Sequence, residues 1–270
     1  MRKRRQKRAT SVLILLLVFI GSFIGIKPQQ AQQLWQTAQQ LLVPAQTTKQ
    51  QTTTTADQLA NLNYQSGKSA VIAVNHNRAT LDPKSWRQNQ VIYADLDRLN
   101  RTSGANIAYL QQRNVADDAL RVQQTVRPTG WHQKFSGRQA ILNRGHLVAY
   151  SISKGISVAG TYDPHQQSGD QNNVKNLFTQ TAFSNQRLQT VYEAKVRNAL
   201  RAGKKVIYRP HAIFRGQELM PRGVHLQAIS TDGSLNFNVY IYNVQPGFIF
   251  NYQTGTSQKA ADQQVPDTTI

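Results

Sequence analysis

Residues 141–151 read ILNRGHLVAYS, an apolar run interrupted at its centre by Asn143, Arg144, Gly145 and His146. A histidine in a strand-like segment has two interpretations. It can be a hydrogen-bonded structural side chain, or it can be a general base, because imidazole has the unperturbed pKa nearest to neutral pH. The segment alone leaves both open, so the choice depends on the other polar residues of the chain.

A second polar series leads into the most helix-like segment. It consists of Asn176 and Gln180 in NLFTQ, Asn185 in TAFSNQ and Glu193 in VYEAK. Amide and carboxylate oxygens are hard ligands, which suit Mg²⁺ or a similar cation that keeps most of its own water. A neutral Asn as the main protein ligand binds such an ion weakly, so substrate phosphate is expected to complete the coordination shell.

The role of Glu193 depends on its spacing from Asn185. Eight residues of helix turn by about 80° and rise by about 12 Å, so both side chains do not easily reach one ion. Glu193 is better placed to hold metal-bound waters. The alternative is a surface ion pair with Arg197 at i+4, worth roughly a few tenths of a kcal/mol. For Asn176 and Gln180 the alternative is ordinary loop capping.

Composition restricts the class of partner. The 270 residues contain 32 Lys and Arg against 13 Asp and Glu, which gives a net charge of +19 and indicates a polyanionic partner. Scattered cations bind phosphate without reading sequence. The candidates for such contacts, each of which could equally be solvated surface, are Arg127, Lys134, Arg138, Lys204, Lys205 and Arg209. The chain has no cysteine, which excludes disulfides and thiolate metal sites and makes a zinc site unlikely.

The sequence divides into four parts. Residues 1–27 combine a basic start with an apolar stretch from about Val12 to Ile26, and are expected to form an uncleaved membrane anchor, with a cleaved signal as the alternative. Its positive charges stay on the cytoplasmic side, which places the rest of the chain outside the membrane. Residues 28–62 are rich in Gln and Thr and predict a tether. Residues 63–255 form the expected folded domain, and 256–270 a flexible tail.

Within the domain, short strand-like runs surround one helix. The runs AVIAVN, QAIL with HLVAYS, KKVIYRPHAIF, VHLQAIS and NFNVYIYNV are rich in β-branched and aromatic residues, and TDG predicts a hairpin between the last two. In residues 184–203, Leu188, Tyr192, Val196 and Leu200 recur every four positions and Gly203 offers a stop. The pattern favours an α+β fold.

The two polar series together carry a family resemblance. Asn143-Arg144-Gly145-His146 resembles the Asp-Arg-Gly-His signature of the ββα-metal, DNA/RNA non-specific endonuclease family. The series from Asn176 to Glu193 is similar to the second motif of that family in residue types and spacing. The stretches RPTGWHQ, ADLDRL and NFNVYIYNVQPGFIFNYQTG also resemble its branch of membrane-associated DNA-entry nucleases of bacterial competence.

The resemblance implies an antiparallel sheet core with a ββα-metal finger, and a metal-dependent endonuclease acting on DNA, with RNA left open. His146 would be the general base and Asn185 would hold hydrated Mg²⁺, with Mn²⁺ as a substitute. Arg144 would stabilise charge in the transition state, and Glu193 would orient metal waters. Asn176 and Gln180 would support the site. The implied partners are nucleic acid, the membrane and the DNA-uptake machinery.

One residue departs from the family pattern, because Asn143 stands where the family usually has Asp. An Asn oxygen still accepts hydrogen bonds, so we predict a working nuclease with a reduced rate or a shifted pH optimum. Two rival functions share the basic charge and the tether: a DNA receptor that does not cut, and a binder of acidic wall polymers. Only the paired motifs favour the enzyme, since a binder needs neither His146 nor Asn185.

Overall fold

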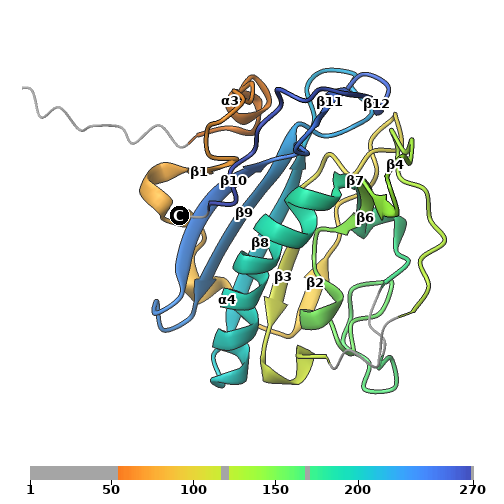
Figure 1. Cartoon of the computed structure of the whole chain (residues 1–270). Helices are drawn as coiled ribbons and strands as arrows, with labels where there is room; N and C mark the ends of the chain where they lie inside the picture. The colour runs from red at the N-terminus through yellow and green to blue at the C-terminus, as the bar shows by residue number, and fades with distance from the viewer. Residues whose placement is uncertain (1–53, 117–121, 168–170, 269–270) are drawn as a thin grey trace, which may run out of the picture. The chain divides into compact units, whose positions relative to one another are not determined.

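The computed structural model describes residues 54–116, 122–167 and 171–268 (Figure 1). The expected anchor and most of the expected tether lie outside these ranges. Within them, no helix has both the length and the apolar character needed to cross a membrane.

A six-stranded sheet in which every pairing is antiparallel forms the centre of the domain. Its strands, in spatial order, are β1 (Val71–Ala73), β10 (Asn236–Tyr242), β9 (Gly223–Ser230), β8 (Val206–Ile213), β3 (Ile107–Leu110) and β2 (Gln90–Ile92). The TDG turn joins β9 to β10 as expected, with Gly233 at a φ of 74°. The α+β prediction is therefore confirmed.

One helix covers a face of this sheet (Figure 1). A π-helix, η7 (Ser184–Gln189), continues directly into α4 (Thr190–Arg201). Leu188, Tyr192, Val196 and Leu200 are all fully buried, and the rings of Tyr192 and Phe237 lie 5.2 Å apart between centroids. The four-residue period therefore marked the core-facing side of the helix.

Beside the sheet, β6 (Leu142–His146) pairs antiparallel with β7 (Leu177–Thr181), and β7 leads into η7. The expected strand HLVAYS ends early, because after His146 the chain turns inward and forms the short 3-10 helix η5 (Tyr150–Ile152). The reason lies in Asn176. Its side-chain oxygen accepts from the Val148 N–H at 2.8 Å and its amide donates to the Val148 carbonyl at 2.9 Å, in place of a strand partner.

Both expected domain boundaries differ from the structure. Helix α3 (Ala56–Ala60) begins at a capping box on Thr55, and its Leu59 is buried in the main core, so the packed unit starts before residue 63. At the other end, β11 (Phe248–Asn251) pairs with β12 (Thr256–Lys259), and Val265 is buried in the same core. A few apolar side chains were enough to dock segments whose composition is mostly polar.

The remaining elements are short. They are the two strands of a hairpin, β4 (Phe135–Ser136) and β5 (Gln139–Ala140), and the 3-10 helices η1 (Asn75–Asn77), η2 (Pro83–Ser85), η3 (Gln112–Asn114) and η6 (Val174–Asn176).

Polar side chains cluster where β9 and β10 meet the segment that contains η1. Gln227 accepts from the backbone N–H of Thr80 at 2.9 Å, and His225 bonds to the side-chain oxygen of Asn238 at 2.6 Å. Because Phe237 points to α4, its neighbour Asn238 points to the opposite face. The part of the second face that carries His225, Gln227 and Asn238 is therefore polar, buried and hydrogen-bonded.

Candidate active site

An open pocket of about 540 Å³ lies at the β6–η7 junction and brings the two sequence motifs together. Asn143, Arg144 and His146 of β6 and Asn185 of η7 all line it. Residues 143–146 and 185 are far apart in sequence, and the pairing of β6 with β7 is what brings them to one site.

Glycine is needed at position 145 for a packing reason. A Cβ atom built on Gly145 would lie 2.2 Å from Oε1 of Gln180 and 2.7 Å from its Cβ. The absence of a side chain therefore makes room for Gln180 to reach across the strand pair.

Gln180 is the centre of a row of hydrogen-bonded side chains, which we call the amide chain. The Asn143 amide donates to Oδ1 of Asn185 at 3.2 Å, and the Asn185 amide donates to Oε1 of Gln180 at 2.8 Å. The Gln180 amide donates to Oε1 of Gln189 at 2.9 Å, and the Gln189 amide donates to Oε1 of Glu193 at 2.8 Å. Every amide donates in the same direction, so the chain ends on a carboxylate, which can only accept.

This direction fixes the orientation of Asn185. Because its amide nitrogen is held by Gln180, its oxygen is the atom left at the pocket end, where it already accepts one hydrogen bond from Asn143. A carbonyl oxygen has two lone pairs, so a second partner can still bind. A hard cation is a suitable second partner.

Glu193 lies behind the pocket and is not one of the residues that line it. Burial raises the pKa of its carboxyl, while the hydrogen bond from Gln189 and the charge of Arg197 lower it. In the described part of the chain no ion pair joins Glu193 to Arg197; instead, Arg197 donates to the Ser151 hydroxyl at 3.2 Å. The structure thus places Glu193 at the end of the amide chain.

His146 presents Nε2 toward the pocket. That nitrogen lies 3.0 Å from Nε2 of Gln124 and 3.1 Å from the carbonyl oxygen of Gln171, and both glutamines line the pocket. In the tautomer with a bare Nε2, the Gln124 amide donates to it. The backbone of His146 is also held, because its carbonyl accepts from the Gln189 amide at 2.8 Å.

Arg144 is held by the segment that precedes β4. Its Nε donates to the carbonyl of Val126, and its guanidinium lies over the ring of Trp131, 4.7 Å from the centroid. A stacked, planar guanidinium keeps terminal N–H groups for a phosphate. Arg144 is therefore oriented before any substrate binds.

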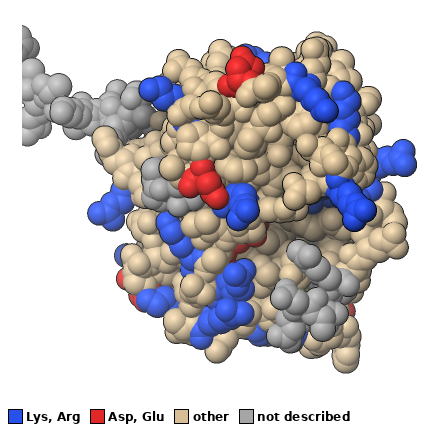
Figure 2. Space-filling model, in the orientation of Figure 1, with Lys and Arg blue, Asp and Glu red and all other residues tan. Residues whose placement is uncertain are grey.

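The other predicted residues divide between near and distant positions. Asn176 is buried at the Val148 backbone and does not line the pocket. Arg127 and Lys134 line an adjoining pocket, and Arg138 is exposed in the β4–β5 turn. Lys and Arg are spread over the visible surface, with few Asp or Glu between them (Figure 2).

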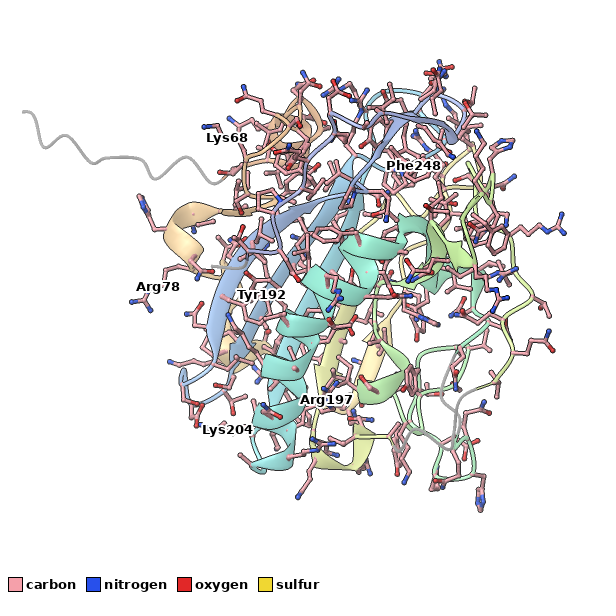
Figure 3. All side chains as sticks on the ribbon, viewed as in Figure 1. Lys68, Arg78, Tyr192, Arg197, Lys204 and Phe248 are labelled. Carbon is pink, nitrogen blue, oxygen red and sulfur yellow. The ribbon has the colours of Figure 1, made fainter. Side chains whose placement is uncertain are left out.

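Three predicted cations are not brought to the pocket. Lys204 follows the C-terminal end of α4 (Figure 3) and forms an ion pair with Asp232 at 3.1 Å. Lys205 lies over the ring of Trp86 at 4.2 Å from the centroid. Arg209 is half-buried on β8, where burial lowers its pKa. None of them lines the pocket that contains His146.

Sequence reasoning missed several residues of the site, namely Gln124, Trp131, Gln171 and Gln189. For Gln189 a signal existed, because it stands four residues after Asn185 and four before Glu193, on the same helix face. The others come from loops, whose approach to His146 no spacing rule predicts.

The donor set suits a weakly held hard cation. Within residues 54–116, 122–167 and 171–268, no group of three or more His, Asp or Glu side chains could hold a metal ion. The oxygen of Asn185 is the ligand that the pocket offers, supported by the amide chain. A hydrated ion that also binds substrate phosphate fits this arrangement.

Comparisons with known proteins point to one family. The family model described as DNA/RNA non-specific endonuclease matches residues 31–266. A crystal structure of NucA from Streptococcus agalactiae with a magnesium ion bound is 29% identical, with a TM-score of 0.61 over 75% of this chain and 92% of that one. The same protein with no metal bound is 28% identical, with a TM-score of 0.59 over 74% of this chain and 91% of that one.

A third structure, Sda1 nuclease with a bound zinc ion, shares the fold at 18% identity. Its TM-score is 0.51 over 71% of this chain and 97% of that one. The two bound metals differ between these relatives, so likeness alone does not select one. The match to the family model covers most of the sequence, including both motifs of the pocket. The chain belongs to the DNA/RNA non-specific endonuclease family.

Proposed function

We propose that this nuclease is a metal-dependent, sequence-non-specific endonuclease that hydrolyses phosphodiester bonds of DNA, with the β6, β7 and α4 unit as its ββα-metal finger. The observation that supports this is that Asn143, Arg144, His146 and Asn185 all line the same pocket. A general base, a guanidinium and a metal-ligand oxygen are the three groups that this hydrolysis needs.

In the proposed mechanism His146 accepts at Nε2 a proton from the water that attacks phosphorus, and Gln124 and Gln171 move aside or hold that water. As the new P–O bond forms, the bond from phosphorus to the leaving oxygen breaks, and that oxygen takes a proton from solvent. Arg144 stabilises the charge that develops on the phosphoryl oxygens. Asn185 holds the cation, taken as Mg²⁺ with Mn²⁺ as a substitute. When bound, this ion supplies Lewis-acid polarisation of the scissile phosphate. The amide chain keeps the Asn185 oxygen directed at the pocket.

Binding of the nucleic acid is proposed to be electrostatic and independent of sequence. Arg127, Lys134 and Arg138 are the predicted cations nearest to β6 in the fold, and phosphate contacts of this kind weaken steeply as salt rises. A flat salt response would contradict this assignment. The same substrate class includes RNA, which the digestion assay below tests.

We place the activity on the outer side of the cell membrane, with the N-terminal segment as anchor and DNA uptake as the setting. The support is the basic start of the chain followed by the apolar stretch that ends near Ile26. Mass spectrometry of the membrane fraction tests it, because a cleaved signal would give a shorter chain in the medium.

The deciding experiment is digestion of linear DNA, circular DNA and RNA with Mg²⁺, with EDTA and by the variant His146→Ala. Nicking of circular DNA shows endonuclease action. We expect EDTA and the substitution each to abolish cutting. His165→Ala is a matched control, since His165 is exposed and does not line the pocket.

Two results would oppose the mechanism. Cutting that resists EDTA, or that survives the loss of His146, would exclude a metal-dependent reaction with this base. A folded wild-type protein that binds DNA and cuts none would favour the receptor.

A further inference from the structure

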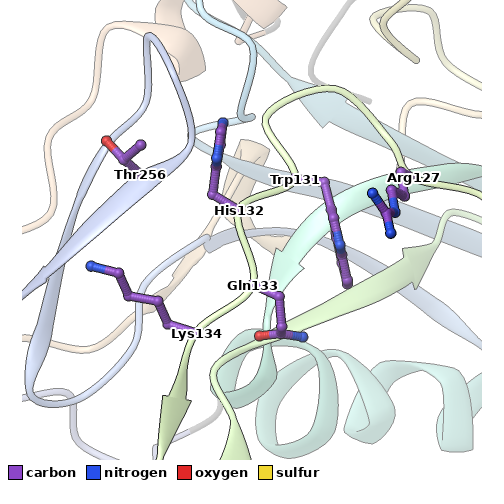
Figure 4. A pocket seen from close by; sticks show the side chains of 6 residues that line it. All are labelled: Arg127, Trp131, His132, Gln133, Lys134 and Thr256. Atoms are coloured by element: carbon purple, nitrogen blue, oxygen red, sulfur yellow. The ribbon is translucent and has the colours of Figure 1, made fainter.

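A second pocket adjoins the candidate active site and shares two of its lining residues. It has a volume of about 480 Å³ and is lined by Arg127, Trp131, His132, Gln133, Lys134 and Thr256 (Figure 4). Trp131 and Gln133 line both pockets. The two pockets therefore lie side by side along residues 131–134.

The segment between the pockets is attached directly to the catalytic strand. The Gln133 amide donates to the Leu142 carbonyl at 2.7 Å, and its Oε1 accepts from the Leu142 N–H at 3.1 Å. The Lys134 carbonyl accepts from the N–H of Ile141 at 3.0 Å. Leu142 is the first residue of β6, so the second pocket keeps a constant position relative to Asn143, Arg144 and His146.

The outer wall is also preformed. Lys134 donates to the carbonyl of Ser257 in β12. Gly255, with a φ of 84°, packs so closely against Gly130 that an added Cβ would lie 1.9 Å from the Gly130 oxygen. These contacts hold the β11–β12 hairpin against the segment, and the pocket does not need to be assembled by its ligand.

The lining combines cations with aromatic rings and contains no carboxylate. Arg127 lies beside Trp131, and Lys134 stands on the opposite side of the segment, toward Thr256 (Figure 4). Cationic side chains bind phosphate, and aromatic side chains stack on bases whose faces are exposed. A volume of this size is typical of sites for small organic groups.

We propose that this pocket holds one unpaired nucleotide that flanks the scissile phosphodiester, with its phosphate at Arg127 and its base against Trp131 and His132. The assignment rests on the proposed function. Bases within a duplex are stacked on one another and cannot offer a face to His132. The enzyme is therefore expected to favour single-stranded or locally unpaired nucleic acid.

The test compares a small substrate with an extended one. Bis(4-nitrophenyl) phosphate is a small activated diester without a flanking nucleotide, whereas a single-stranded oligonucleotide has one. In the variants His132→Ala and Arg127→Ala, the ratio of kcat/KM for the oligonucleotide to kcat/KM for the diester is expected to fall about tenfold. Trp131 is left unchanged, because it also orients Arg144.

Arg78→Ala is the matched control. Arg78 is exposed, and Figure 3 shows it beside η1, on the opposite side of the domain from the β4 hairpin. This variant is expected to keep the wild-type ratio. A second readout uses fluorescence anisotropy in EDTA, where the wild type should bind a labelled single strand more tightly than the duplex and His132→Ala should lose that preference.

An unchanged ratio in both variants, or equal wild-type affinity for single strand and duplex, would overturn the proposal. Failure of the proposed function looks different, since the wild type would then hydrolyse neither substrate. The anisotropy measurement would still report on the pocket in that case.

Discussion

The amide chain makes a quantitative prediction at Gln189. This side chain is fully buried and makes three hydrogen bonds, to the Gln180 amide, the His146 carbonyl and the Glu193 carboxylate. Gln189→Leu removes all three while keeping a similar volume. Gln180 retains one other partner, the hydroxyl of Ser184 at 3.1 Å. The His146 carbonyl and the Glu193 carboxylate each lose the hydrogen bond from Gln189.

A buried polar group without its partner costs about 1–3 kcal/mol. With two such groups, partly offset by burial of the leucine, we expect the free energy of unfolding to fall by roughly 3 kcal/mol. Activity should fall further than stability explains, because the Asn185 oxygen and the His146 backbone both lose their support. A displacement of about 1 Å at such groups lowers the rate by up to about a hundredfold.

The matched control is Gln227→Leu, which removes a buried glutamine from the opposite face of the sheet. Among the described residues, Gln227 accepts from the backbone N–H and the hydroxyl of Thr80. The Gln227→Leu variant should have a lower free energy of unfolding, measured by urea unfolding, and should keep the wild-type kcat at temperatures where it stays folded. For Gln189→Leu, kcat should fall about ten- to a hundredfold, and a Mn²⁺ titration followed by electron paramagnetic resonance should show weaker binding.

The reasoning would be refuted if Gln189→Leu kept the wild-type kcat and Mn²⁺ affinity. It would equally be refuted if Gln227→Leu lost activity to the same extent, because the effect would then be one of stability.

Three further predictions concern the metal site, the glycine and the polar sheet face. Asn143→Asp replaces the amide that donates to Asn185 by a carboxylate, so Mg²⁺ affinity in an activity titration should rise at least about tenfold. An inactive wild type restored only by this change would contradict the assignment of Asn143. Gly145→Ala forces Gln180 out of position, and should lower stability by about 1–3 kcal/mol and activity at least about tenfold, measured by urea unfolding and plasmid digestion. Burial lowers the pKa of His225 to about 4, so its contribution to stability is present above about pH 6.5 and is lost as pH falls through about 4. The part of the loss due to His225 should be roughly 2 to 3 kcal/mol between about pH 7 and pH 4.5 in urea unfolding and should be absent in His225→Gln. The part due to His211, whose pKa burial also lowers, should remain in that variant, and an undiminished total loss would assign the effect to another group.

Much of the site could be predicted from the sequence. The residue types in NRGH and the polar series from Asn176 to Glu193 were enough to predict a hydrolytic site, and the four-residue period marked the buried side of the helix. Both are local signals, because helical spacing and motif order are properties of the chain itself.

Other features could not be predicted, since they depend on contacts between distant segments. Position 145 requires glycine because Gln180 crosses the strand pair there, and Glu193 ends a chain of amides behind the pocket. Three predicted phosphate ligands, at positions 204, 205 and 209, are instead engaged or half-buried elsewhere.

The sequence by itself indicated the fold class and the family and predicted the chemical groups of the proposed reaction, because these follow from residue types and their order. Only the tertiary structure decided which polar side chains meet. Hydrogen bonds are short-ranged and directional, so a shift of one residue in the β6–β7 register would separate Asn143 from Gln180. The direction of the amide chain, and with it the orientation of Asn185, exists only in the folded protein.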